Sequence, residues 1–256
     1  MRDQHVVSLF FKITLEDGVT FQSTPILKYE NDLFSLHLEE NILTIKPKLH
    51  YASQEEARKE ITPFLRAWQL DDALRMGKIT FRFEYKDAEI VDLNPSRSGE
   101  PKAILVGFSD LIAVADTVTV VVPRLEFPRP SGSFSTSPDV ETLWHRYERY
   151  AKGYEPLPGM AYFCLTLLEA RGGTRDGASS KFKISKDILD KLGELTTKHG
   201  DPSVARKYPR KTQPKPFTPA EVAWIQASVR AIIRRVAEYI VIDQLPRITM
   251  ADLPAI

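Results

Sequence analysis

The hydrophobic pattern of this chain changes its period once, at a proline-rich stretch, and this change constrains the fold more than any other feature. Before the stretch, apolar residues form short runs or alternate with polar ones, and after it they recur at helical spacing. The stretch itself, VPRLEFPRPSGSFSTSP at 122–138, has four prolines and little amphipathic order. We therefore predict a β-rich domain over residues 1–125, a linker over 126–137 and a helical domain over 138–256.

The first part of the chain has the composition of an antiparallel sheet. Short runs dense in β-branched and aromatic residues, such as VVSLFFKI, LFSLHL and ILTIKP, are separated by turn formers. In KITFRFEY, apolar Ile79, Phe81, Phe83 and Tyr85 alternate with polar residues, which is typical of a strand with one buried face and one wet face. We expect a mostly antiparallel β-rich domain.

One or two helices interrupt these strands. Ser53 and Glu56 have the spacing of a capping box, in which a hydroxyl and a carboxylate satisfy free backbone N–H groups at a helix start. Pro63 follows seven residues after Glu56, and proline inside a helix removes a hydrogen bond and clashes with the preceding turn. We expect Pro63 to end or kink this helix, or to begin a second one.

The second part predicts an α-helical bundle of four main helices. Ser137 and Pro138 suit the N-cap and first position of one helix, and Thr218, Pro219 and Glu221 form a capping box for a long helix over about 219–240. Between them, MAYFCLTLLEA is apolar on nearly every face, which favours a place at the centre of the bundle. The expected fold class is α+β.

Composition indicates a soluble protein in a reducing compartment. The single cysteine cannot form an intramolecular disulfide, and the N-terminus lacks the continuous apolar core of a signal peptide, so we expect a cytoplasmic location. Residues 104–122 are nearly long enough to span a membrane but carry Asp110 and Asp116, each of which would cost roughly 2.5 to 3.5 kcal/mol near the bilayer centre. We interpret this stretch as buried strands and expect no membrane association.

Several catalytic classes lack support in the sequence. No histidine lies near another histidine or a cysteine at metal-ligand spacing, no Gly-x-Ser-x-Gly elbow occurs, and the glycine-rich RGGTRDGASS lacks the order of a phosphate-binding loop. We interpret that segment as a flexible loop and expect no metal and no cofactor. Cys164 lies in the apolar helix, where its thiol should pack as a small hydrophobe with a raised pKa.

The stretch WHRYERYAKGYEPL, residues 144–157, interleaves aromatic and basic residues. Such interleaving can stack nucleobases and hold phosphates. Trp144 and Tyr147, however, fall on one helical stripe, which favours a core position for the aromatics with solvated charged flanks. An enzyme with scattered catalytic residues stays an alternative, and it would need side chains such as His145 and Glu155 to face one cleft.

Positive charge gathers in the second half of the chain. Residues 1–137 hold 16 basic and 20 acidic side chains, whereas residues 138–256 hold 19 and 14. Within the second half, DPSVARKYPRKTQPKPF has no acidic residue after Asp201, and three arginines follow on the last helix, two of them one turn apart. The predicted anion-binding residues are Arg206, Lys207, Arg210, Lys211, Lys215, Arg230, Arg234 and Arg235.

These cations support one leading functional hypothesis. We expect a non-catalytic binding protein whose helical domain contacts an anionic partner such as RNA or DNA, because guanidinium groups one turn apart can grip phosphate oxygens. The alternative is a protein-interaction or assembly subunit, with Trp224, off the main apolar stripe, and the proline-rich connector contacting another protein or a second copy of the chain.

Overall fold

The computed structural model describes residues 3–21, 26–94, 127–198 and 216–256. These residues belong to two compact units. The sheet unit comprises Met1–Gln69 and Ile79–Pro130, and the helical unit comprises Leu70–Lys78 and Ser131–Ile256. A five-stranded antiparallel sheet in the first half and helices concentrated in the second confirm the expected α+β fold class.

The strands of the sheet unit follow the order β2-β3-β4-β1-β5, and every neighbouring pair is antiparallel. Four of them coincide with predicted runs, whereas the four-residue β2 was not predicted, because it is too short to show a period. The expectation for 104–122 lies outside the described residues. The strands are β1 (Gln4–Leu15), β2 (Leu27–Glu30), β3 (Phe34–Glu39), β4 (Ile42–Pro47) and β5 (Phe81–Asp92).

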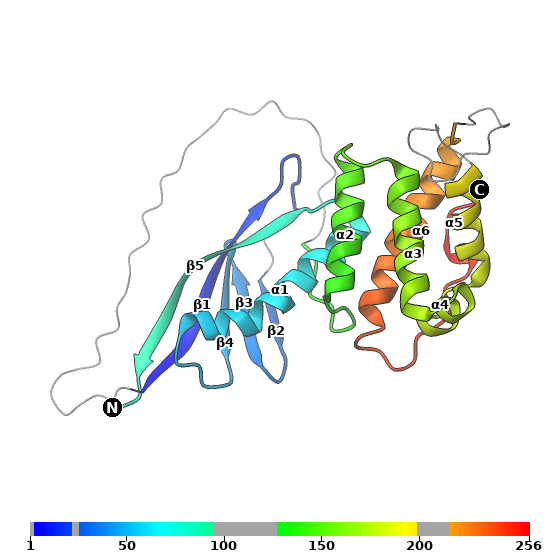
Figure 1. Cartoon of the computed structure of the whole chain (residues 1–256). Coiled ribbons are helices and arrows are strands. Elements are labelled where there is room, and N and C mark those ends of the chain that lie inside the picture. Colours follow the sequence, from blue (N-terminus) through cyan, green and yellow to red (C-terminus); the bar gives the residue numbers. More distant parts are fainter. Residues whose placement is uncertain (1–2, 22–25, 95–126, 199–215) are drawn as a thin grey trace. The chain divides into compact units, whose positions relative to one another are not determined.

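Alternation along the strands places one face of the sheet against helix α1 (Gln54–Met76), which is drawn along that face in Figure 1. Leu36, Leu38 and Ile45 are buried on this face together with Ile61 and Trp68 of α1. Burying such side chains contributes about 1.5 to 3 kcal/mol each, so the shared apolar core holds the helix on the sheet.

Pro63 lies inside α1, so the expectations that it ends the helix or begins a second one are wrong, while the expected kink stays a prediction. The helix begins as expected, since the Ser53 hydroxyl accepts a hydrogen bond from the Glu56 backbone N–H. A proline in a helix interior costs about 3 kcal/mol. The helix nevertheless continues because Ile61 and Leu65, on either side of the proline, are both buried in the core.

The helical unit is built from α2 (Pro138–Ala151), α3 (Leu157–Gly172), α4 (Arg175–Phe182), α5 (Lys186–Lys198) and α6 (Pro219–Glu238), with the end of α1. The Ser137 cap of α2 and the capping box of α6 are present as predicted. Helix α3, which carries the apolar MAYFCLTLLEA, contacts α2, α4, α5 and α6, so its central place in the bundle is confirmed.

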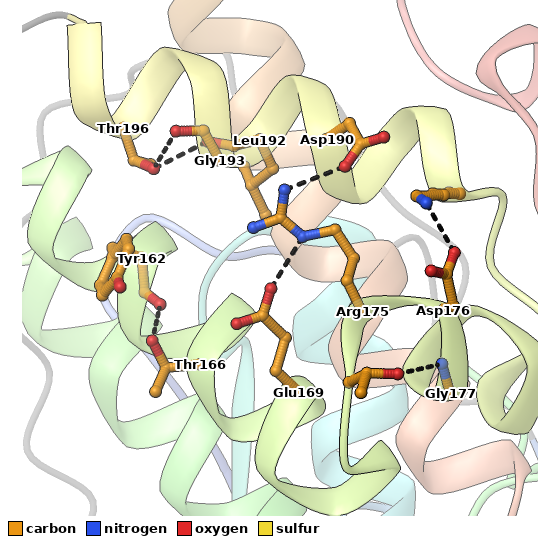
Figure 2. Close-up of polar contacts among 12 residues, drawn as sticks. Tyr162, Thr166, Glu169, Arg175, Asp176, Gly177, Asp190, Leu192, Gly193 and Thr196 are labelled. Carbon is orange, nitrogen blue, oxygen red and sulfur yellow. Dashed lines mark hydrogen bonds and ion pairs between the residues drawn. The ribbon is translucent and has the colours of Figure 1, made fainter.

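The glycine-rich segment is not a flexible loop, because most of it forms α4. A Cβ atom on Gly172 would lie 2.2 Å from the Ala178 nitrogen, and one on Gly177 would lie 2.0 Å from the Gly172 carbonyl oxygen. The two glycines therefore allow the backbones at the α3–α4 corner to approach closely. Figure 2 shows Arg175 of α4 between Glu169 and Asp190, at 2.7 and 2.9 Å. This ion-pair cluster ties α4 to α3 and α5.

In the part of the chain that the structure describes, no helix is both long and apolar enough to cross a membrane.

Candidate functional site

Five of the eight predicted anion-binding residues, Arg206, Lys207, Arg210, Lys211 and Lys215, lie outside the described residues. Their contact with an anionic partner stays a prediction. The other three, Arg230, Arg234 and Arg235, lie on α6.

Arg234 forms an ion pair with Asp71 of the same chain. Its Nη1 donates a hydrogen bond of 2.5 Å to Oδ1 of Asp71, and its Nη2 donates one of 3.0 Å to the Asp71 carbonyl oxygen. The Asp71 side chain is only 3% exposed and also accepts from Arg75 at 2.6 Å. The expectation of a guanidinium group open to phosphate is therefore corrected for Arg234. A buried carboxylate is stable only with such charged partners.

Arg235 is 4% exposed, so the expectation that it lies at the edge of an exposed face is also corrected. Its Nη1 donates to the Pro246 carbonyl oxygen, and its Nε lies 3.2 Å from Oε2 of Glu238. Burial lowers the pKa of Arg235, and Glu238 opposes this shift. The side chain connects α6 to the C-terminal segment, and it does not present charge to a partner.

Arg230 is partly buried against the end of α1. A Cβ atom on Gly77 would lie 3.0 Å from Nη1 of Arg230 and 3.5 Å from the Tyr147 hydroxyl. Gly77 has φ of +75°, a conformation that favours glycine. Burial raises the pKa of Tyr147, and the charge of Arg230 opposes that shift. Arg230 has no ion pair with a described carboxylate, but its guanidinium packs inside the unit.

A concave site does occur elsewhere in the helical unit. A pocket of about 480 Å³ lies among α2, the α2–α3 connection, α3 and α5. We call it the Glu155 pocket. Figure 2 shows three of its residues, Tyr162 and Thr166 on α3 and Thr196 on α5. Its described lining residues are Arg146, Glu155, Pro158, Gly159, Tyr162, Phe163, Thr166 and Thr196.

The Glu155 carboxylate is the buried charge of this pocket. Its side chain is 8% exposed, and Oε1 accepts a hydrogen bond of 2.8 Å from Nη1 of Arg146. Oε2 lies 3.7 Å from Nε of Arg149, too far for a hydrogen bond, and it has no hydrogen-bond donor among the described residues. A buried carboxylate oxygen without a donor costs free energy.

The two threonines add acceptors to the same pocket. Thr166 donates its hydroxyl proton to the Tyr162 carbonyl oxygen at 2.9 Å, and Thr196 donates to the Leu192 carbonyl oxygen at 2.8 Å (Figure 2). With their protons used in this way, both hydroxyl oxygens can only accept from a ligand. The pocket therefore suits a molecule that donates hydrogen bonds.

Aromatic and cationic groups lie at the rim. The guanidinium carbon of Arg146 lies 4.4 Å from the centroid of the Phe163 ring. Tyr154, next to Glu155 in the chain, is 72% exposed, and Arg149 is 48% exposed. Exposed arginine and aromatic groups beside a pocket are the combination that binds a phosphate and a planar ring.

The aromatic residues of α2 are buried in the core, which is the position that the sequence pattern favours. Trp144 and Tyr147 are 2% and 4% exposed. The aromatic residues among the described residues that line the pocket are instead Tyr162 and Phe163, both on α3. Sequence reasoning missed Phe163 and Thr196, because pocket residues from separate helices share no spacing in the chain.

His145 is exposed and is not among the described residues that line the Glu155 pocket, so His145 and Glu155 do not face one cleft there. Burial raises the pKa of Cys164 to about 12, which confirms its packing role. Trp224 is fully buried, so its expected contact with another protein is wrong. Among the described residues, no group of three or more His, Cys, Asp or Glu is placed to hold a metal ion.

No protein-family model matches the sequence, and no curated protein or solved structure shows significant similarity to the chain.

Proposed function

We propose that this protein binds single-stranded RNA or DNA through its helical unit, with one base in the Glu155 pocket and phosphates against the arginines of α2. The observation that carries the proposal is the pocket lined by Glu155, whose buried carboxylate has one oxygen without a hydrogen-bond donor among the described residues. A non-catalytic binding role is proposed with it.

The chemistry of the pocket favours a base with an amino group. Adenine, cytosine and guanine each carry an exocyclic amino group, whereas uracil and thymine have only carbonyl oxygens as exocyclic polar groups. Glu155 Oε2 can accept from such a group, and Phe163 offers a ring for stacking. A base inserted in this way leaves its Watson–Crick partner, so the favoured ligand is single-stranded.

The charges of α2 support phosphate contact. His145 and Arg149 are exposed on this helix, Lys152 is exposed directly after it, and Arg146 is partly exposed. Lys152 pairs with Glu148 at 3.0 Å and Arg146 pairs with Glu155 at 2.8 Å, so Arg149, whose Nε lies 3.7 Å from the Glu155 carboxylate, is the main candidate for phosphate oxygens. Arg146 is held by its hydrogen bond to the Glu155 carboxylate.

The predicted basic stretch keeps a part in this proposal. Arg206 follows Thr196, a pocket residue, by ten positions in the chain. We propose that the cations of residues 206–215, which follow α5 in the sequence, add phosphate contacts. Arg234 and Arg235 have no part in the proposal, because they have partners inside the protein.

The test is fluorescence anisotropy with labelled oligo(A), oligo(C) and oligo(U) over a series of salt concentrations. Phosphate contacts predict an affinity that falls steeply with salt, and Arg149→Gln should reduce the slope of log K against log salt by about 1. Arg247→Gln, an exposed arginine of the same unit outside the pocket, is the control and should leave the slope unchanged.

The base preference tests the pocket itself. The wild type should prefer oligo(A) or oligo(C) to oligo(U), because uracil lacks the amino group. Glu155→Gln should shift the preference toward oligo(U), since an amide nitrogen can donate to the uracil O4 carbonyl. Equal affinity for all three oligonucleotides in both proteins would contradict base binding in the pocket. Flat binding across salt concentrations would overturn the proposal as a whole.

A further inference from the structure

A second concave site lies in the sheet unit, across the neighbouring strands β2, β3 and β4 (Figure 1). Its volume is about 600 Å³, within the range of about 300 to 1,000 Å³ that is typical of small-molecule sites. We call it the sheet pocket. Its lining is mostly polar, and the described lining residues are Lys28, Tyr29, Glu30, Ser35, Leu36, His37, Thr44 and Lys46.

The polar side chains of the sheet pocket lie on the face of the sheet that α1 does not cover. Leu36 and Leu38 of β3 are buried in the core that the sheet shares with α1. Ser35 and His37 alternate with them along the strand and therefore point to the opposite face. Both are only half-buried, so a ligand can reach this face without displacing the core.

Strand register brings three more polar residues beside these two. Lys28 of β2 is the cross-strand partner of His37, and Lys46 of β4 is the partner of Ser35. Thr44 of β4 is the partner of His37 on its other side. Side chains directly opposite each other have Cβ atoms about 4.5 to 5.5 Å apart, so the five side chains form one continuous polar surface.

Lys28 and Lys46 supply positive charge to the sheet pocket. Both side chains are exposed, and neither forms an ion pair or a hydrogen bond with a described residue. Glu30, the acidic member of the described lining, pairs with Lys48 at 2.7 Å. The charges of the two lysines are therefore available to an anionic ligand.

Two hydroxyl groups line the pocket together with the lysines. The side chains of Ser35 and Thr44 make no hydrogen bond with a described residue, so each hydroxyl can donate to a ligand and accept from it. His37 offers less, because its Nε2 lies 3.2 Å from Oε2 of Glu39 and its Nδ1 is enclosed. The available groups thus suit a ligand that carries both negative charge and hydroxyl groups.

The tyrosine of the pocket packs its ring against α1. Tyr29 stacks on Phe64 of α1 with ring centroids 5.3 Å apart, and its ring lies 6.4 Å from that of Phe34. Leu36, the other nonpolar lining residue, is 4% exposed. The pocket therefore favours a polar ligand over one that stacks through an aromatic ring.

We propose that the sheet pocket binds a sugar monophosphate, in which a phosphate group is attached to a hydroxylated, non-aromatic frame. Lys28 and Lys46 carry ammonium groups on flexible four-carbon stems, so both can turn toward one phosphate. The hydroxyls of Ser35 and Thr44 bond to the sugar. This pocket shares no residue with the Glu155 pocket, so it stands independently of nucleic-acid binding by the helical unit.

Isothermal titration calorimetry on the full chain tests this site with glucose 6-phosphate, ribose 5-phosphate, glucose and inorganic phosphate. At least one sugar phosphate should bind about tenfold or more tightly than glucose, which lacks the charge, and than inorganic phosphate, which lacks the hydroxylated frame. Inorganic phosphate that binds as tightly as both sugar phosphates would overturn the proposal. Absence of saturable binding of either sugar phosphate at millimolar concentration would overturn it as well.

Replacement of the lysines tests the phosphate contact. Lys28→Gln and Lys46→Gln should each weaken sugar-phosphate binding about tenfold, because a charge-assisted contact is lost. Lys12→Gln is the matched control, since Lys12 is an exposed lysine on β1 of the same sheet and does not line the pocket. Circular dichroism checks that the three variants keep the fold. Equal affinity of all three for the sugar phosphate would contradict the site.

Two further variants test the hydroxyl contact and the location of the site. Thr44→Val keeps the shape of the side chain and should weaken sugar-phosphate binding about threefold to tenfold, while binding of inorganic phosphate stays unchanged. Arg149→Gln, in the helical unit, should leave the affinity for the sugar phosphate unchanged. A loss of affinity in Arg149→Gln without a loss in Lys28→Gln would place the binding in the helical unit and overturn the proposal.

Discussion

Arg234 and Asp71, which lie 163 positions apart in the chain, form one of the buried ion pairs that organise the helical unit. The arginine donates to both the carboxylate and the carbonyl oxygen of the aspartate. The pair holds the end of α1, which carries Asp71, against α6. The sequence suggests that Arg234 binds an external anion, but in the structure Arg234 pairs with the carboxylate of Asp71.

Replacing Arg234 should destabilise the protein. In Arg234→Gln, Asp71 would keep Arg75 but lose its second charged partner while still buried, which should cost about 2 to 3 kcal/mol. Arg75→Gln is the control and should cost less, because the Arg75 side chain is 50% exposed. Urea unfolding measures both changes, and an equal loss for the two variants would contradict the importance of the Arg234 contact.

The α3–α4 corner should not accept a side chain at its close approach. Gly177→Ala would place a Cβ atom 2.0 Å from the Gly172 carbonyl oxygen, so the corner must open, at a cost of about 1 to 3 kcal/mol or more. Gly132→Ala is the control, because no atom lies within 4 Å of that Cβ position. Thermal unfolding should separate the two variants. Similar midpoints for both would contradict the tight corner.

The ion pair between Arg171 and Asp139 should make stability depend on acid pH. Both hydrogen bonds are 2.7 Å, and the bond from Arg171 lowers the pKa of Asp139. A carboxyl whose pKa is lower in the folded state stabilises the protein above its unfolded pKa of about 3.9, and that stability is lost as the pH falls through the lowered value.

Asp139→Asn should therefore cost about 0.5 to 1 kcal/mol at pH 7, since Arg171 is largely exposed and solvent screens the pair. The difference from the wild type should shrink as urea unfolding is repeated below about pH 4. Arg171→Gln should show the same trend, because it breaks the same pair. A difference that stays constant down to pH 2 would contradict this assignment.

The Cys164 thiol should be unreactive in the folded protein. Its pKa of about 12 leaves it protonated at pH 8, and its side chain is fully buried. Reaction with an aromatic disulfide reagent should be at least about a thousandfold slower in the native protein than in urea, because the thiolate is the reacting species. Rapid labelling of the native protein would show that α3 is more accessible than the structure indicates.

Local patterns in the sequence determined the elements of this protein. The alternation in KITFRFEY placed β5, and the capping residues Ser137 and Thr218 placed the starts of α2 and α6, because these signals act over a few neighbouring residues. Burial of Cys164 also followed from its apolar helix. The continuity of α1 through Pro63 did not, since core packing offset a local preference.

The candidate sites depended on tertiary structure. The Glu155 pocket brings Glu155 and Thr196 together from separate elements. Likewise, only the fold gave Arg234 its partner Asp71. A side chain's charge can be read from the sequence, but its availability to a ligand depends on distant residues that folding brings within a few ångströms.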